Sequence, residues 1–168
     1  MMMRSLPPLA KFIFIGVAAV LLLAGIGYWL NMDSQVRLDV KILKVRVVPT
    51  GDSSSLAVVD FRVRNLSGAL FQLKKLTIVV TTAGGEKVEG QPVTQDDLDR
   101  VLDYHGLYGK RHTEMLKARD RLRPKTEQDR TAAAGFNVSE QALAGRKGLV
   151  MKLQDADGAI IEVAETGR

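Results

Sequence analysis

The two histidines and their neighbours are the most chemically varied group in this 168-residue chain. Close to them in the sequence are Tyr104, Tyr108, Lys110 and Arg111. A metal site built on His105 and His112 would need a nearby acid to fold inward as a third ligand. Gly106 and Gly109 interrupt a helix between the histidines, so we expect His105 to complete the apolar face of a helix instead. The sequence therefore predicts no metal site.

Acidic and hydroxyl side chains elsewhere in the sequence form neither a complete catalytic group nor a complete set of metal ligands. Asp155 and Asp157 before Gly158 resemble the start of a calcium loop, but a later bidentate acid is missing, so we predict a hairpin turn. Ser53–Ser55 and Thr81–Thr82 have no recognisable general base. The absence of cysteine excludes disulfides, Cys-based zinc sites and thiol nucleophiles. We predict no catalytic residue, no cofactor and no enzyme.

Charge is segregated within one stretch of the chain. Asp96–Asp103 is acidic, whereas Lys110–Arg130 holds eight Lys/Arg against four Asp/Glu. This stretch could meet acidic lipid headgroups, peptidoglycan acids or an acidic protein surface; the alternative is a solvated surface. Mixed charges without interleaved aromatics argue against nucleic acid. The candidate interaction residues are Asp96, Asp97, Asp99, Lys110, Arg111, Lys117, Arg119, Arg121 and Arg123.

The segment Phe12–Leu30 predicts a transmembrane helix. It contains 16 apolar or aromatic residues and three glycines and no charge, and 19 helical residues span about 28 Å, close to the thickness of a bilayer core. Lys11, Tyr28 and Trp29 are predicted to lie at the membrane interfaces. Residues 1–11 would then be a short tail, and residues 31–35 a linker.

The charges that flank this segment predict its orientation. Arg4, Lys11 and the amino terminus precede it without an acid, which places the N terminus in the cytoplasm and the rest of the chain across the membrane. A cleaved secretory signal is the alternative. The apolar stretch is longer than the core of a usual signal, so an uncleaved anchor fits better.

The remaining residues, 36–168, are predicted to form an exported β-sandwich. Apolar residues alternate from Val36 to Val48 with a change of phase between Ile42 and Leu43, which indicates a bulge or a bend that lets one strand serve two sheets. Further strands are expected at 56–65, 70–82, 87–90, 130–138, 148–155 and 159–164, with hairpin turns at 83–86 and 156–158. About seven strands without intervening helices at βαβ spacing favour an antiparallel, immunoglobulin-like sandwich.

A helical insertion is expected at about 94–124. Thr94 can cap a helix that ends near Gly106, with acids in its first turn and Leu98, Val101, Leu102 and His105 on one face. A second helical stretch is predicted from Thr113 through Leu122, stopped by Pro124.

The strand from Val58 to Asn65, its loop and the strand from Leu70 resemble the late-embryogenesis-abundant type 2 proteins and the related water-stress domain. In that family an alternating strand ends at an asparagine before a second strand of an immunoglobulin-like sandwich. The match covers about a third of the exported domain; Leu66 stands where the family usually has proline, and the insertion lies outside the pattern. The resemblance implies a sandwich fold and a role in stress protection. We expect Asn65 to stabilise a turn through its side chain.

These features predict a single-pass membrane protein whose extracytoplasmic sandwich binds or supports another envelope component. The domain would be periplasmic in a Gram-negative source. Its partners would be the lipid bilayer, through residues 12–30, and another envelope or membrane protein. The alternative is a small accessory subunit of a membrane complex that is held mainly through its transmembrane helix.

Overall fold

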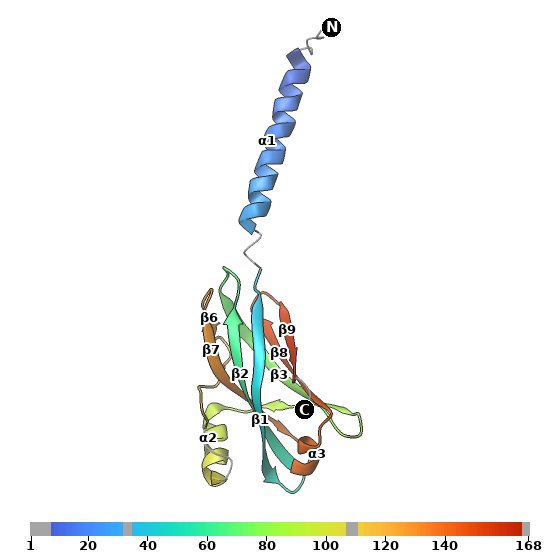
Figure 1. Ribbon diagram of the computed structural model, residues 1–168, viewed down its shortest axis with the longest axis vertical. Helices are drawn as coiled ribbons and strands as arrows, with labels where there is room; N and C mark the ends of the chain where they lie inside the picture. Colours follow the sequence, from blue (N-terminus) through green and yellow to red (C-terminus); the bar gives the residue numbers. More distant parts are fainter. Residues whose placement is uncertain (1–7, 32–34, 107–110, 166–168) are drawn as a thin grey trace. The chain divides into compact units, whose positions relative to one another are not determined.

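A computed structural model describes residues 8–31, 35–106 and 111–165 and divides the chain into two units, one up to Gln35 and one from Val36. The first unit contains one helix, α1 (Pro8–Asn31), shown in blue in Figure 1. Its stretch Phe12–Trp29 is long and apolar enough to cross a membrane. Length and composition of this kind suit both a membrane anchor and a signal sequence.

The second unit is an antiparallel β-sandwich, as predicted (Figure 1). One sheet has the order β1-β2-β7-β5, formed by Leu38–Gly51, Ser54–Asn65, Glu127–Phe136 and Gln91–Pro92. The other has the order β4-β3-β8-β9, formed by Lys87–Glu89, Phe71–Thr81, Gly148–Asp155 and Ile160–Ala164, and β6 (Arg121–Leu122) pairs with β3. The alternating side chains of both sheets meet in a core that includes Phe61, Phe71, Ile78 and Met151, all almost fully buried.

The change of phase in the first strand is a β-bulge. The β1–β2 register shifts between Ile42 and Lys44, and Leu43 between them is about half exposed. The bulge was therefore predicted correctly. The prediction that this strand serves two sheets is wrong for the described residues, because β1 pairs along its length with β2 alone.

Helix α2 (Gln95–Tyr104) covers the outer face of the first sheet. The Asp97 N–H donates to Thr94 Oγ1 (3.2 Å), which confirms the predicted cap. Leu98 and Leu102 are buried in a second apolar cluster with residues of β1, β2 and β7. The middle of β2 is consequently buried on both faces.

The predicted second helix at 113–122 is not formed. Met115 instead makes a parallel bridge to Thr131 of β7, and the segment ends in the short strand β6. Its apolar residues are divided between the two clusters, so they cannot form the single stripe that a helix would need. Among the described residues of the sandwich unit, a short α-helix follows β7: α3 (Glu140–Ala144), a single turn capped by Ser139 that was not predicted from the sequence.

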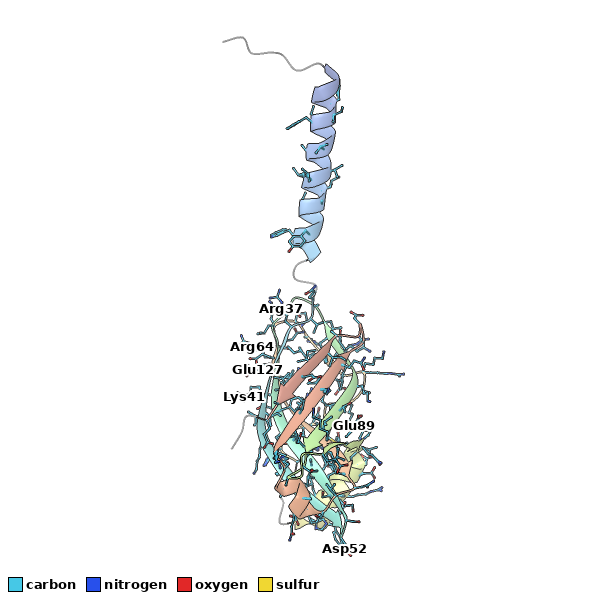
Figure 2. All side chains as sticks on the ribbon, turned by 90° about the vertical axis from the view of Figure 1, so that its right-hand side faces the viewer. Arg37, Lys41, Asp52, Arg64, Glu89 and Glu127 are labelled. Carbon is cyan, nitrogen blue, oxygen red and sulfur yellow. The ribbon has the colours of Figure 1, made fainter. Side chains whose placement is uncertain are left out.

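Figure 2 shows which residues lie at the two ends of the sandwich. Arg37, directly before β1, lies at one end, and Asp52, in the turn between β1 and β2, lies at the other. Glu89 of β4 lies between these two ends.

Candidate ligand site

The chain crosses from the second sheet to the first at Gly90, between β4 and β5. Its N–H donates to the Ile78 carbonyl (2.8 Å), and the chain then pairs with β7. A Cβ atom at this position would lie 2.6 Å from both the Ala134 Cβ and the Phe136 Cζ. This crossing therefore needs a glycine because the backbone passes directly over the side chains of β7.

A second crossing returns the chain from the first sheet to the second. Leu116 N–H donates to the Thr131 carbonyl (2.9 Å) on β7. Three residues later, Arg119 N–H donates to the Leu73 carbonyl (2.7 Å) on β3. Arg119 has a φ of 73°, and the Asp120 carboxylate accepts from Lys117 N–H (2.8 Å), so a tight turn redirects the chain.

The two crossings bracket a cavity of about 520 Å³ in the side of the sandwich. One wall is formed by residues 73–76 and Ile78 of β3, and the other includes residues 132–134 of β7. Residues 93–96 at the start of α2 and residues 115–118 of the second crossing complete the lining.

Basic side chains predominate at the polar margin of this cavity. Lys74, Lys75 and Lys117 line it and are exposed, and Asp96 is the acid in the lining. Lys75 Nζ lies 3.4 Å from a Glu89 carboxylate oxygen, with both side chains more than half exposed. The cavity thus combines apolar walls with a positively charged margin.

The outer edge of β3 is covered at both ends of the cavity. β6 pairs with Phe71–Gln72, and β4 pairs with Val79–Thr81. Among the described residues no strand pairs with Lys74–Thr77 on this side, a stretch of about 13 Å at 3.3 Å per residue. The open part of the edge is therefore short and closed at each end by the chain itself.

The predicted interaction residues are scattered, and two of them reach this cavity. These two are Asp96 and Lys117. Asp97 caps α2 with Thr94 and lies 3.9 Å from Arg100, while Arg119, Arg121 and Arg123 are exposed around β6. Lys110 lies outside the described residues, as does Tyr108, and the side chain of Lys11 is not described. Lys74 and Lys75 were missed because they occur in a strand, away from the charged stretch.

Asp99 and Arg111 form an ion pair between α2 and the segment after it. Arg111 Nε lies 3.1 Å from Asp99 Oδ1, and its Nη2 lies 3.2 Å from Oδ2. Hydrogen bonding to Asp99 raises the pKa of Arg111, and desolvation opposes this shift. This pair holds the chain after α2 in place, so both residues have structural partners.

The histidines do not form a metal site in the described structure. His105 caps the C terminus of α2, and its ring contacts the Tyr104 ring edge-on at 4.9 Å between centroids. His112 is exposed. Within residues 8–31, 35–106 and 111–165, no three His, Asp or Glu side chains are placed to hold a metal ion.

The hairpin predicted at 156–158 is confirmed. Gly158 has a φ of 94° in the turn between β8 and β9. The buried Asp155 carboxylate accepts from Gln72 N–H (2.8 Å) and so joins β8 to β3. Among the hydroxyls considered for catalysis, Ser55 Oγ donates to the Val138 carbonyl (2.7 Å), a structural contact.

Asn65 is fully buried and ties together the turn after β2. Its Nδ2 group donates to the carbonyls of Ala69 (2.8 Å) and Leu122 (3.2 Å). Its Oδ1 accepts from the Ser67 N–H (3.0 Å) and hydroxyl (2.7 Å). The prediction that Asn65 stabilises a turn is confirmed.

No family model matches this chain, and no curated protein matches it. The solved structures that are similar to it include two of low identity. One is the crystal structure of a Bordetella pertussis protein provisionally assigned as ApaA, with 13% identity and a TM-score of 0.39, covering 80% of this chain and 93% of the other. The second, an X-ray structure of a Northeast Structural Genomics Consortium target, has 14% identity and a TM-score of 0.35, covering 83% and 86%. Neither assigns a ligand or an activity to this chain, and the resemblance to late-embryogenesis-abundant type 2 proteins stays a prediction.

Proposed function

We propose that this protein is a single-pass membrane protein whose sandwich lies outside the cytoplasm and binds an envelope component in its side cavity. The observation that carries the proposal is the cavity between the two chain crossings. Its volume falls within the range of about 300–1,000 Å³ of small-molecule sites, and its apolar walls with a few charged groups at the margin are typical of them.

The flanking charges support this orientation. Arg4 and Lys11 precede the apolar helix without an acid, as expected for a cytoplasmic N terminus. Tyr28 and Trp29 are exposed near the other end of α1, where amphipathic rings favour the interface. An uncleaved anchor would tether the sandwich to the membrane, where envelope components are concentrated.

Single cysteines test the orientation because the natural chain has none. Ser5→Cys and Asp52→Cys variants would be treated in intact spheroplasts with a membrane-impermeant maleimide. We expect labelling at position 52 and, only after lysis, at position 5. The opposite pattern would reverse the proposed topology, and a mature chain that lacks position 5 would show cleavage.

A photoreactive residue in place of Lys117 tests the binding site in cells. Lys117 lies at the cavity margin and is exposed, so the substitution leaves the core intact. Lys41 of β1, also exposed and outside the cavity lining, is the matched control. We expect adducts with an envelope component at position 117 and none at position 41. Equal adducts at both positions, or none at 117, would contradict the proposal.

The second candidate function is an accessory subunit that acts through α1. The large apolar side chains of Phe12–Trp29 that the structure describes are exposed, so they are available to lipid or to another helix. Exchanging this segment for an unrelated spanning helix separates the two functions. Retained function favours the sandwich, whereas lost function with normal insertion favours the helix.

A further inference from the structure

We infer that the side cavity takes a single-chain anionic amphiphile, with its acyl chain in the cavity and its acidic headgroup at the lysines. This inference rests on the proposed binding function and names the ligand class. It is argued from the shape of the opening, the chemistry of its walls and the charges at its margin.

The shape of the opening excludes an added strand of ordinary length. A peptide that paired with β3 would have to fit beside Lys74–Thr77. Beyond this stretch the peptide would meet Gly90, whose N–H donates a hydrogen bond to the Ile78 carbonyl, or Asp120, whose carbonyl accepts one from Leu73 N–H. A ligand must therefore enter end-on, as a thin chain can.

The walls favour a hydrocarbon chain. Leu76, Val93 and Ala118 line the cavity with accessible apolar surface, and the lining also includes Leu73, Ile78 and Leu116 of the core between the sheets. A peptide placed here could pair its main-chain polar groups only along the short open edge Lys74–Thr77, whereas an acyl chain has no polar groups that need partners. Burying methylene groups against these walls is favourable, by about four-fold in affinity for each one.

The margin favours an acidic headgroup. Lys74 and Lys117 are exposed at the opening, and Lys75 forms an ion pair with Glu89. Asp96 is the acidic residue in the lining. A carboxylate or phosphate at the opening would meet an excess of positive charge, and a neutral headgroup would gain nothing from it.

Photolabelling of the full-length chain in lipid nanodiscs tests the inference. The probe is hexadecanoic acid that carries a diazirine, and the neutral probe is the corresponding alcohol. Labelled peptides are quantified by mass spectrometry. Labelling of α1 from the bilayer reports how much probe has partitioned, and the peptide with the β8–β9 hairpin reports background on the sandwich.

We expect saturable labelling of Leu73–Ile78 or of residues 115–118 by the acid, above the hairpin background. Ala118 is exposed at the opening, so Ala118→Trp should fill it without disturbing the core and should lower this labelling at least five-fold, while α1 labelling is unchanged. The double variant Lys74→Gln/Lys117→Gln should lower labelling by the acid about five-fold and leave labelling by the alcohol unchanged. Lys41→Gln/Lys44→Gln removes the same charge elsewhere and should have no effect.

Cavity labelling at the hairpin background would overturn the inference, as would labelling that Ala118→Trp does not reduce. Equal labelling by acid and alcohol, insensitive to the lysine variants, would overturn the assignment of an acidic headgroup. If the probes fail in this way while the photoreactive residue at position 117 still captures a protein in cells, the proposed function stands with a protein ligand. Absence of α1 labelling would instead contradict the membrane anchor.

Discussion

Met115 and Leu116 are adjacent in the chain, yet each packs in a different apolar cluster. Met115 lies with Leu98 and Leu102 beneath α2, and Leu116 lies in the core between the two sheets. This division requires an extended backbone, because successive side chains of a strand point to opposite faces. The pair therefore connects the covering helix, the first sheet and the side cavity.

Removal of the Asn65 side chain should be strongly destabilising. Asn65→Ala leaves the Ser67 N–H and the Leu122 carbonyl without their buried partner, so we expect a loss of about 3 kcal/mol in the free energy of unfolding. Chemical denaturation of the purified protein measures it. Asn137→Ala is the matched control, because Asn137 is exposed at the end of β7 and should change stability by less than about 0.5 kcal/mol. Equal effects would refute the role given to Asn65.

A methyl group at residue 90 should disturb the first crossing. Gly90→Ala places a Cβ within 2.6 Å of the side chains of Ala134 and Phe136, so we expect a loss of about 1–3 kcal/mol. Gly84→Ala is the control, because its Cβ would meet only Thr82 Oγ1, at 3.7 Å. Thermal unfolding should rank the variants in this order, and a neutral Gly90→Ala would show that the crossing is looser than described.

Shortening Leu98 should loosen α2 from the sheet. Leu98 is fully buried against the outer face of the first sheet, so Leu98→Ala should cost about 2–5 kcal/mol. Tyr104→Ala, at the exposed end of the same helix, should be nearly neutral. Limited proteolysis, read as the rate of cleavage within Gln95–Tyr104, should rise in the first variant only. Unchanged cleavage and stability would mean that α2 does not depend on this contact.

The ion pair between Arg62 and Asp129 should give stability a pH dependence on the acid side. A hydrogen bond from Arg62 (Nε to Oδ1, 2.7 Å) holds the pKa of Asp129 below its usual value; desolvation opposes the shift and the Arg62 charge assists it. Because the folded pKa is the lower one, this contribution is present above about pH 4 and is lost as pH falls through the folded value. Asp129→Asn should therefore lower the midpoint of thermal unfolding at pH 7 and converge with the natural protein in acid. In an Arg62→Gln background, the same substitution should lose this pH-dependent effect.

The strands were the most predictable part of the fold. Alternation over long runs predicted β1, β2, β3 and β8, and the change of phase at Leu43 predicted the bulge, because a half-buried strand shows its pleat in the sequence. Thr94 and the apolar positions after it likewise predicted α2. β5 and β6 have two residues each, too few for a period to be visible.

The cavity could not be predicted from local pattern. Lys74 and Lys75 read as polar positions of one strand, and Ala132–Ala134 as an unremarkable part of another. Their relationship depends on the sheet order and on the two crossings, which are decided by contacts between residues far apart in the chain. The segment 113–122 was misread for the same reason, because its apolar residues serve two separate clusters.

The second crossing has a limited backbone attachment to β7. Two backbone hydrogen bonds join it to Thr131 of the sheet: Leu116 N–H donates to the Thr131 carbonyl, and Thr131 N–H donates to the Glu114 carbonyl. By contrast, β2 is hydrogen-bonded along its length to a neighbouring strand on each side. Local release of this segment should therefore cost much less free energy than global unfolding. In hydrogen exchange, the amides of Leu116 and Thr131 should then exchange well before those of Val58 and Val59. A ligand could then enter the cavity while the rest of the sandwich stays folded.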